Sequence, residues 1–478
     1  MMPSIKTETA SAIQPSHDNM VFQQPPVQDP ALLHRSLTQQ PHIVTHAQGN
    51  YLYLANGQKV LDACGGAAVA IIGHRNGEVI TATVEQMQNV SYVHTMAYTT
   101  SSAEMLATML LEASKGMHRL AKAYLVGSGS EANEAALKAA RQYFVEKGEL
   151  QRCHYVARRQ SYHGNTMGAM MVSSNLARKG PYNDILPTNV SFVSPTYAYQ
   201  YQRKDETEEQ YSERLILELR HEILRIGHEK VISFIAEPVV GATSGCTTAP
   251  KGYFRGIRDI CNEFGILLHF DEVMCGVGRT GTYFAFEQEG IVPDIVTLGK
   301  GLGGGYVPVS AMLLSEKVVD VLRRGTSAFN HGQTFQAHPV ACAAGLAVQN
   351  IIKRDGLVER CAEAGKHLGT LLRETFANCK YVGDIRGRGL FWALEFVEDR
   401  SSKRPFEKSI KFGEMIQKTA FDLGVAFYPG TGTVDGMEGD HILMAPPLTV
   451  SKDELFTLVA VLKQAYEITE QAVKPRVT

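Results

Sequence analysis

Short apolar runs alternate with amphipathic stretches between about residues 121 and 298. The runs AKAYLV, HYVA, VSFVS, VISFIAE, ILLHFDE and DIVTLG predict buried strands. The stretches between them, such as SEANEAALKAARQYFVEKG and GYFRGIRDICNEFG, predict helices. This alternation is typical of an α/β fold with a mainly parallel sheet, whose functional site lies beyond the carboxyl ends of the strands.

The pattern changes on both sides of this region. Residues 1–28 are rich in Ser, Thr, Gln and Pro and predict a flexible tail. Asn56-Gly57 separates two β-like runs and predicts a hairpin. After about residue 340, two helices, two strands and a C-terminal helix with a serine N-cap predict a smaller α+β domain. We therefore expect four parts: the tail 1–28, a segment 29–75 that joins the small domain, a large domain 76–340, and a C-terminal small domain 341–478.

Composition and charge narrow the class of protein. The 478 residues are 44% hydrophobic and carry 47 basic and 49 acidic side chains, a formal net charge of −2. This balance gives no signal for nucleic acid or an anionic membrane, so small molecules are the expected partners. No apolar run reaches the roughly 18 residues of a membrane span, and the N-terminus has no secretory apolar segment. We expect a cytoplasmic enzyme.

Several familiar sites are absent from the sequence. The eight cysteines form no C-x-x-C pair and predict reduced, buried thiols. His221-Glu222 and His228-Glu229 lack a second histidine at zinc-protease spacing, and no metal site is expected. There is no G-x-S-x-G motif, and Gly301 stands where a nucleotide-binding loop needs Ser or Thr after the lysine.

The segment AYLVGSGSEANEAALKAAR places a Gly-Ser-rich turn between a strand and a long helix. Backbone N–H groups at a helix N-terminus bind phosphate, Gly129 allows close approach, and Ser130 adds a hydroxyl. A serine there also serves as a simple helix cap. The turn further matches a G-x-G-x-x-A dinucleotide fingerprint through Gly127, Gly129 and Ala132. This motif alone leaves all three interpretations open.

Two charged residues stand at the ends of predicted strands. Asp271 ends ILLHFDE, where its partner is either a cationic ligand nitrogen or a structural arginine such as Arg279. Lys300 follows DIVTLG within a run of glycines. It is either a nucleophile that forms a Schiff base with an aldehyde or a solvated loop lysine.

Two further motifs complete the set. Tyr162 in YHGNT offers a ring that stacks on a planar ligand or packs in the core. Thr334 offers a hydroxyl before a helix that starts at Pro339. A phosphate site, an aromatic ring, an aldehyde-reactive lysine and a carboxylate for a ring nitrogen together specify pyridoxal phosphate.

The chain resembles the class III (subgroup II) aminotransferases of fold type I from about residue 40 to residue 470. The motifs are SGSEANEAALK, YHGNT, AEPVVGA, FDEVxxGxGRTG, TLGKGLGGG, HGxTFxxHPxAxAA and APPL, in this order. The resemblance implies the PLP-transferase fold type I, an α/β architecture in which a large domain with a mainly parallel sheet carries a smaller α+β domain. It also implies pyridoxal 5'-phosphate as cofactor and a homodimer with shared active sites.

The resemblance implies roles for individual residues. As catalytic residues, Lys300 bonds covalently to the cofactor and shuttles the substrate proton, and Asp271 keeps the pyridinium nitrogen protonated. Tyr162 stacks on the ring, and the neighbouring subunit supplies Thr334 to the phosphate. Gly129 and Ser130 hold that phosphate. The remaining cofactor-binding residues implied are Ser128, His163, Glu237 and Val273, and Gly65-Gly66-Ala67 and Tyr98 border the substrate pocket.

Four positions depart from related members. Asn165, Ala242 and Leu443 stand where ornithine-type members have an arginine, a gating glutamate and a carboxylate-binding arginine. Tyr428 stands where many ω-amino-acid and amine transaminases have a mobile arginine. Without these bidentate groups, an α-amino acid clamped in that way is not expected. Arg388 either binds a substrate carboxylate or supports the small-domain sheet.

We therefore expect a ping-pong aminotransferase that moves an amino group between an amine or ω-amino donor and a keto-acid, aldehyde or ketone acceptor. A decarboxylating transaminase or an aminomutase would share the same cofactor residues. A nicotinamide dehydrogenase would need an acidic residue where Arg158-Arg159 stand, and it leaves Lys300 and Asp271 unexplained. A catalytically silent scaffold conflicts with the full set of cofactor residues.

Overall fold

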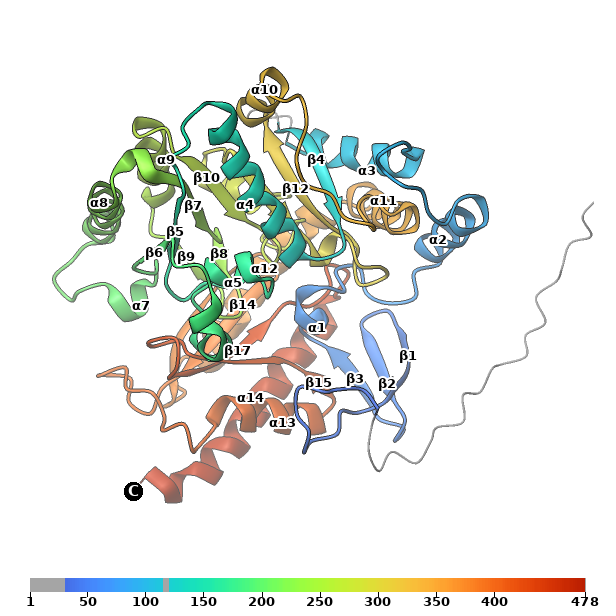
Figure 1. Cartoon of the computed structure of the whole chain (residues 1–478). Helices are drawn as coiled ribbons and strands as arrows, with labels where there is room; N and C mark the ends of the chain where they lie inside the picture. Colours follow the sequence, from blue (N-terminus) through green and yellow to red (C-terminus); the bar gives the residue numbers. More distant parts are fainter. Residues whose placement is uncertain (1–30, 115–119, 478) are drawn as a thin grey trace, which may run out of the picture. The chain divides into compact units, whose positions relative to one another are not determined.

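A seven-stranded sheet forms the centre of the computed structural model, which describes residues 31–114 and 120–477 (Figure 1). Its strand order is β4-β12-β11-β10-β7-β5-β6. The strands are β4 (Leu120–Val126), β5 (His154–Arg158), β6 (Val190–Val193), β7 (Val231–Ala236), β10 (Leu267–Asp271), β11 (Ile295–Leu298) and β12 (Ser310–Ser315). Only β12 runs antiparallel to its neighbours, so the prediction of a mainly parallel sheet is confirmed.

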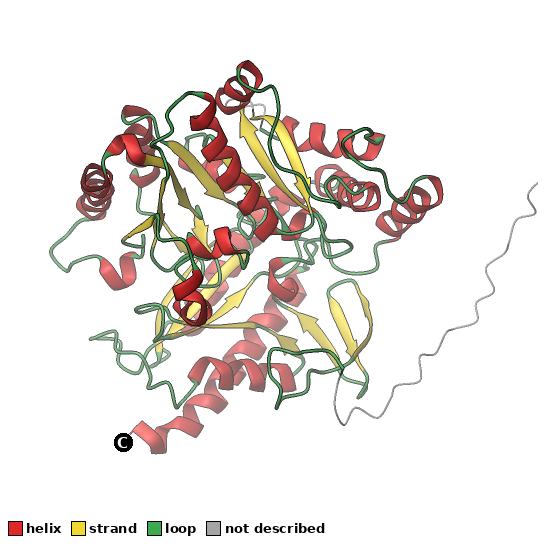
Figure 2. Ribbon diagram, in the orientation of Figure 1, coloured by secondary structure: helices red, strands yellow, loops and turns green. Residues whose placement is uncertain are grey.

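Helices cover both faces of this sheet, as Figure 2 shows. Helix α4 (Gly129–Glu146) and helix α10 (Glu316–Arg324) pack on one face, and α3 (Ser101–Glu112), α8 (Glu208–Ile226) and α9 (Tyr253–Glu263) pack on the other. Successive β12 side chains show the two-sided burial, because Ala311 and Leu313 join one core and Met312 and Leu314 join the other. A sheet buried on both faces explains the near-continuous apolar runs in the sequence.

A second sheet and three long helices form the C-terminal part. The sheet has the order β13-β14-β17-β16 and is antiparallel throughout. Its strands are β13 (Val382–Arg388), β14 (Phe391–Phe396), β16 (Tyr428–Thr431) and β17 (Asp440–Met444), and the helices are α12 (Leu357–Phe376), α13 (Phe412–Asp422) and α14 (Lys452–Val477). Ser451 Oγ accepts the Glu454 N–H at 3.1 Å, which confirms the predicted serine cap before the last helix.

A third sheet joins distant parts of the sequence. Strands β1 (Val44–Gln48), β2 (Tyr51–Leu54) and β3 (Lys59–Asp62) form an antiparallel meander, so the hairpin predicted at Asn56-Gly57 is confirmed. Strand β15 (Val425–Ala426) then pairs with β3 in parallel. The boundaries at residues 75 and 340 stay a prediction.

The remaining elements are short or flank the sheets. They are α1 (Gly65–Ala68), α2 (Gly77–Asn89), α5 (Met167–Met171), α6 (Leu176–Lys179), α7 (Ala198–Tyr201), α11 (Pro339–Arg354), β8 (Val239–Val240), β9 (Thr247–Thr248) and the 3₁₀ turns η1 (Gly180–Ile185), η2 (His228–Lys230), η3 (Ala285–Glu289) and η4 (Lys300–Leu302). Residues 31–43 form a separate unit without helix or strand, and the predicted tail 1–28 lies outside the described residues. Within the described ranges no helix has both the length and the apolar character to cross a membrane.

All eight cysteines are free thiols, and seven of them are buried. Cys153 is exposed, so the expectation of buried thiols is wrong for this residue. It precedes β5 at the amino end of the strand, where the chain enters the sheet from the surface.

Candidate active site

The predicted site residues follow parallel strands that end at one edge of the large sheet. Ser128, Gly129 and Ser130 follow β4, Tyr162 and His163 follow β5, Glu237 follows β7, Asp271 ends β10, and Lys300 follows β11. Because the carboxyl ends of parallel strands share an edge, the fold itself gathers residues that lie up to 172 positions apart (300 − 128).

The turn between β4 and α4 is a capped helix N-terminus. Ser128 is the N-cap residue, and its Oγ accepts the Glu131 N–H at 3.2 Å, so its role as a helix cap is observed. The first amides of the helix, at Gly129 and Ser130, have no acceptor within the helix and are available to an anion. A Cβ added at Gly129 would lie 2.7 Å from Val273 Cγ1. Glycine is therefore required for Val273 to pack against this turn.

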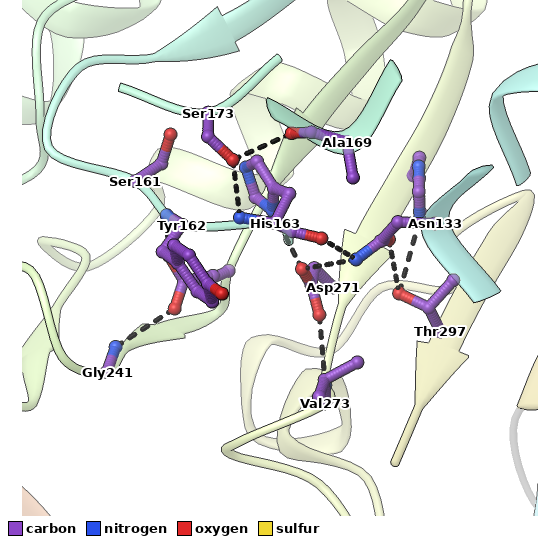
Figure 3. Close-up of polar contacts among 12 residues, drawn as sticks. Asn133, Ser161, Tyr162, His163, Ala169, Ser173, Gly241, Asp271, Val273 and Thr297 are labelled. Carbon is purple, nitrogen blue, oxygen red and sulfur yellow. Dashed lines mark hydrogen bonds and ion pairs between the residues drawn. The ribbon is translucent and has the colours of Figure 1, made fainter. Parts of the chain in front are cut away.

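Asp271 is held by three groups, as Figure 3 shows. Its Oδ2 lies 2.7 Å from His163 Nδ1 and accepts the Asn133 side-chain N–H at 2.9 Å. Its Oδ1 accepts the Val273 N–H at 3.0 Å. The carboxylate is only 3% exposed, but its partners satisfy both oxygens.

These partners also decide the charge of Asp271. Burial is the largest influence on its pKa and opposes ionisation, but the hydrogen bond and charge of His163 and the Val273 N–H outweigh it and lower the pKa below its ordinary value. The reverse holds for Glu272, where burial raises the pKa to about 8. Two adjacent buried carboxyl groups are thus pushed in opposite directions, and Asp271 is the one that stays ionised at neutral pH.

Tyr162 and Glu237 form the neighbouring wall of the site. Glu237 Oε1 accepts the Tyr162 N–H at 3.1 Å, and Glu237 Oε2 accepts the Gly241 N–H at 3.0 Å. Burial raises the pKa of Glu237. The carboxyl group thereby ties the loop after β5 to the loop after β7 and fixes the position of the half-buried Tyr162 ring.

Lys300 has a left-handed backbone conformation and an amine whose pKa is lowered. Its φ is 45°, a left-handed conformation that costs a non-glycine residue about 1–3 kcal/mol. Burial lowers the pKa of its ammonium group to about 8, although the charges of Glu237 and Asp271 act to raise it. A lysine that loses its proton near neutral pH is a nucleophile rather than a solvated loop cation.

Thr334 and Tyr98 are not joined to this cluster in a single chain. Thr334 is exposed, and its carbonyl accepts the Tyr92 hydroxyl at 3.1 Å. Pro339 is the first residue of α11, as predicted. Tyr98 is 66% exposed. Within the described ranges, no hydrogen bond connects either side chain to Lys300 or Asp271.

The arginines weighed as alternatives have structural partners. Arg279 donates to the carbonyls of Leu390 and Pro446, so it is not the partner of Asp271. Arg388 pairs with Glu289 at 2.6 Å, which favours support of the small sheet over substrate binding. Arg158 is buried and donates to Thr196 Oγ1 and the Glu237 carbonyl. It is therefore not free to bind a nucleotide phosphate.

Sequence reasoning missed Asn133 and Thr297. The Asn133 amide donates to Asp271 Oδ2 and to the His163 carbonyl at 2.7 Å, and its Oδ1 accepts the Thr297 hydroxyl at 2.9 Å. The available signal was an amide on the mostly apolar buried face of a helix, beside Ala132, Ala135 and Ala136. Asn133 is thus the brace of the Asp271–His163 pair.

Asn133→Ala is expected to lower the free energy of unfolding by about 1–3 kcal/mol, because it leaves the His163 carbonyl and one Asp271 lone pair buried without a donor. Chemical denaturation of the cofactor-free protein measures this change. Thr297→Val is the matched control, since it removes the Asn133–Thr297 bond but keeps both donations to the pair. An Asn133→Ala protein no less stable than Thr297→Val would contradict the bracing role.

The donor set fits pyridoxal phosphate. A helix N-terminus suits a phosphate, a lysine amine that loses its proton at about pH 8 suits an aldehyde, an ionised aspartate suits a pyridinium nitrogen, and the Tyr162 ring suits stacking. Within residues 31–114 and 120–477, no three His, Cys, Asp or Glu side chains are grouped as metal ligands.

Comparison with known proteins agrees with this chemistry. The sequence profile of the family "Aminotransferase class-III" matches residues 33–466. An uncharacterized aminotransferase of Schizosaccharomyces pombe is 46% identical over 92% of this chain and 96% of its own length. The crystal structure of an (S)-enantioselective omega-transaminase from Thermomicrobium roseum is 33% identical, covers 90% of this chain and 93% of its own, and has a TM-score of 0.84.

A structure of the omega-transaminase of Pseudomonas jessenii in complex with PMP is 30% identical, covers 91% of this chain and 94% of its own, and has a TM-score of 0.85. The nicotinamide dehydrogenase interpretation is wrong, because the matching family spans the whole large sheet and both flanking regions. The chain belongs to the class-III aminotransferases, enzymes of PLP-transferase fold type I that depend on pyridoxal phosphate.

Proposed function

We propose that this aminotransferase moves an amino group between an amine or ω-amino donor and a keto-acid, aldehyde or ketone acceptor by a ping-pong mechanism. The observation that carries the proposal is the pairing of a lysine whose pKa is lowered to about 8 with an aspartate held ionised, at one edge of one sheet. A lysine that releases its proton at about pH 8 is suited to accept and return a substrate proton, and an aspartate held ionised is suited to pair with a pyridinium nitrogen.

When bound, pyridoxal phosphate supplies an electrophilic aldehyde carbon and a ring that takes up electron density from the substrate carbon. Lys300 Nζ would hold the cofactor covalently and, once released, accept and return the substrate proton. Asp271 would keep the ring nitrogen protonated. Gly129 and Ser130 would bind the phosphate with their amides, with Ser128 as the cap that orients the turn.

The other four residues would shape the ring site. Tyr162 offers its ring to one face, and Val273, which packs against Gly129, offers its side chain to the other. His163 would set the position and charge of Asp271 through the 2.7 Å contact of its Nδ1. Glu237 would fix the Tyr162 backbone.

At three of the four positions that depart from related members, Ala242, Tyr428 and Leu443, the side chain carries no charge. Leu443 is buried in a cluster with Ala68, Met274 and Ala445, and Tyr428 packs against the same cluster. An aliphatic or aromatic amine is compatible with these uncharged side chains, and an α-carboxylate finds no cation at these three positions themselves. The similarity to an omega-transaminase supports an amine donor.

We further infer that two copies of the chain complete the site, with Thr334 reaching the partner's phosphate. Phe335, next to Thr334, is 64% exposed, which is unusual for an apolar side chain of a single chain. Tyr92 lies edge-on to Phe335 and bonds to the Thr334 carbonyl, so these residues form one surface. Analytical ultracentrifugation of the holoenzyme is expected to give a dimer.

The test is amino transfer by the holoenzyme. Protein purified with pyridoxal phosphate is incubated with a ¹⁵N-labelled amine, and the spectrum and the labelled products are recorded after a keto acid or an aldehyde is added. Transfer of the label without release of carbon dioxide supports the proposal. Carbon dioxide release indicates a decarboxylating transaminase, and a shift of the label within one molecule indicates an aminomutase. A protein that binds no pyridoxal phosphate overturns the proposal.

The reactivity of Lys300 is expected to rise with pH around a midpoint of about 8. Its amine is mostly protonated below this value and neutral above it, so labelling by pyridoxal phosphate and borohydride should increase about 15-fold between about pH 6.5 and about pH 8. Mass spectrometry of the peptide that carries Lys300 measures the labelling. The exposed Lys251 is the control, and equal midpoints for the two lysines would contradict the assignment.

A further inference from the structure

One arginine at the edge of the site has no acidic partner. Arg178 follows Asn175 in α6, and its backbone N–H donates to Asn175 Oδ1 at 3.3 Å. Its guanidinium lies 4.9 Å from the centre of the Tyr162 ring, within the range of a cation–π contact. Within the described ranges, no carboxylate forms an ion pair with it.

Two other cations, Lys179 and Arg386, have protein partners. Lys179 donates to the carbonyls of Met171 and Ser173. Arg386 pairs with Asp384 and Glu395. Arg178 differs from these two cations because, among the described residues, its guanidinium forms no ion pair and its donors can bind a ligand.

Arg178 also lines a cavity beside the substrate positions. The cavity has a volume of about 170 Å³, and its walls include Gln160, Ala242, Thr243 and Tyr428. None of the described residues that line it is acidic, and Arg178 alone carries a charge. Taking about 30 Å³ for each water molecule, the space holds roughly five waters or one small organic acid.

Arg178 and Lys300 interact electrostatically. Burial is the largest influence on the pKa of Lys300 and lowers it, whereas the charges of Glu237 and Asp271 raise it. The charge of Arg178 also acts on Lys300 and lowers its pKa. The guanidinium is linked to the site by geometry as well, because it lies against the Tyr162 ring.

We propose that Arg178 binds the carboxylate of a 2-oxo acid acceptor in the cavity between Tyr428 and Ala242. This assignment rests on the proposed transaminase function and names one class of acceptor for it. A guanidinium presents a planar fork that fits a carboxylate with two hydrogen bonds, whereas it repels the ammonium form of an amine donor. The Tyr162 ring orients the fork from one side through the cation–π contact.

One pocket can then serve both half-reactions. An uncharged amine donor uses the uncharged side chains of Ala242 and Tyr428, and the acid acceptor uses Arg178. This arrangement explains how the chain manages without a cation at Asn165, Ala242, Tyr428 and Leu443.

The test compares Arg178→Met with the wild-type holoenzyme on two acceptors. The acid is whichever of pyruvate, 2-oxobutanoate and 2-oxoglutarate the wild type uses best, and the neutral acceptor is butanal. We expect kcat/KM for the acid to fall about 30- to 100-fold, mainly through KM, and kcat/KM for butanal to change less than about 3-fold. Arg178→Lys keeps the charge without the fork and should lie between the two.

A second readout does not depend on turnover. Calorimetric titration of the holoenzyme with propanoate, which cannot accept an amino group, should show binding that Arg178→Met weakens at least about tenfold. Lys179→Met is the matched control, because it removes an equal charge from the same helix end but a donor that faces backbone carbonyls. It should leave the ratio of acid to aldehyde activity unchanged.

Each result decides the inference. An equal loss for both acceptors, or no loss for either, overturns the role of Arg178 while the transaminase function stands. A wild type that uses butanal but no 2-oxo acid also overturns it. A wild type that transfers an amino group to no acceptor overturns the proposed function itself.

Discussion

Lys300→Ala is expected to lower amino transfer by at least about 10⁴-fold. The substitution removes both the nucleophile and the base, and a positioned base alone contributes about 10²–10⁴-fold. Single-turnover rates with an amine and pyridoxal phosphate measure the loss. The folded state should tolerate the change or gain from it, because a buried amine is costly, whereas alanine and lysine bear the same cost of the left-handed backbone at φ 45°.

Two controls distinguish a loss of catalysis from a loss of folded structure. Lys251→Ala removes an exposed lysine far along the chain from the strand ends and should keep full activity. Adding methylamine to Lys300→Ala should restore part of the rate, since a free amine can replace the missing base. Retention of more than about one-hundredth of wild-type activity in Lys300→Ala would contradict the assigned role.

Asp271→Asn is expected to lower kcat by about 10²- to 10³-fold, the size of effect seen when one preorganised electrostatic group is removed from a site. The pKa of Asp271 lies below its ordinary value, so the wild-type carboxylate is charged throughout the neutral range. Asparagine has nearly the same shape but cannot carry that charge. The affinity for pyridoxal phosphate and kcat are measured separately, and kcat should change more.

Asp294→Asn is the matched control for a buried aspartate. Asp294 precedes β11 at the opposite end of the strand from Lys300 and pairs with Arg258 at 2.9 Å. Its replacement should lower stability, because Arg258 is left buried without its partner, but not the turnover of the folded fraction. Equal effects of the two substitutions on kcat would show that Asp271 acts only through folding.

Residues that follow parallel strands were within reach of sequence reasoning. The apolar runs locate the strands, and parallel geometry places Asp271 and Lys300 at one edge without any knowledge of the rest of the chain. The same reasoning locates the turn at Gly129. What position alone cannot supply is the protonation state, which depends on burial and on partners such as His163.

Features set by tertiary packing were out of reach. Strand β12 is apolar like its neighbours, and nothing in such a run encodes that it alone is antiparallel. In the sequence, Asn133 is a polar residue within an alanine-rich helix. Only the structure shows that its amide donates to Asp271. Arg178 lies in a four-residue helix, and its lack of an ion-pair partner is visible only in three dimensions.

The pairing of β3 with β15 has a consequence for synthesis of the chain. Leu61 and Asp62 bond to a strand whose residues are translated more than 360 positions later (425 − 61 = 364), and the Ala445 N–H then bonds to the Ala63 carbonyl. Loop closure over such a separation is slow relative to local folding. The edge of β3 therefore stays open while most of the protein leaves the ribosome, and a chain truncated before residue 425 exposes that edge permanently.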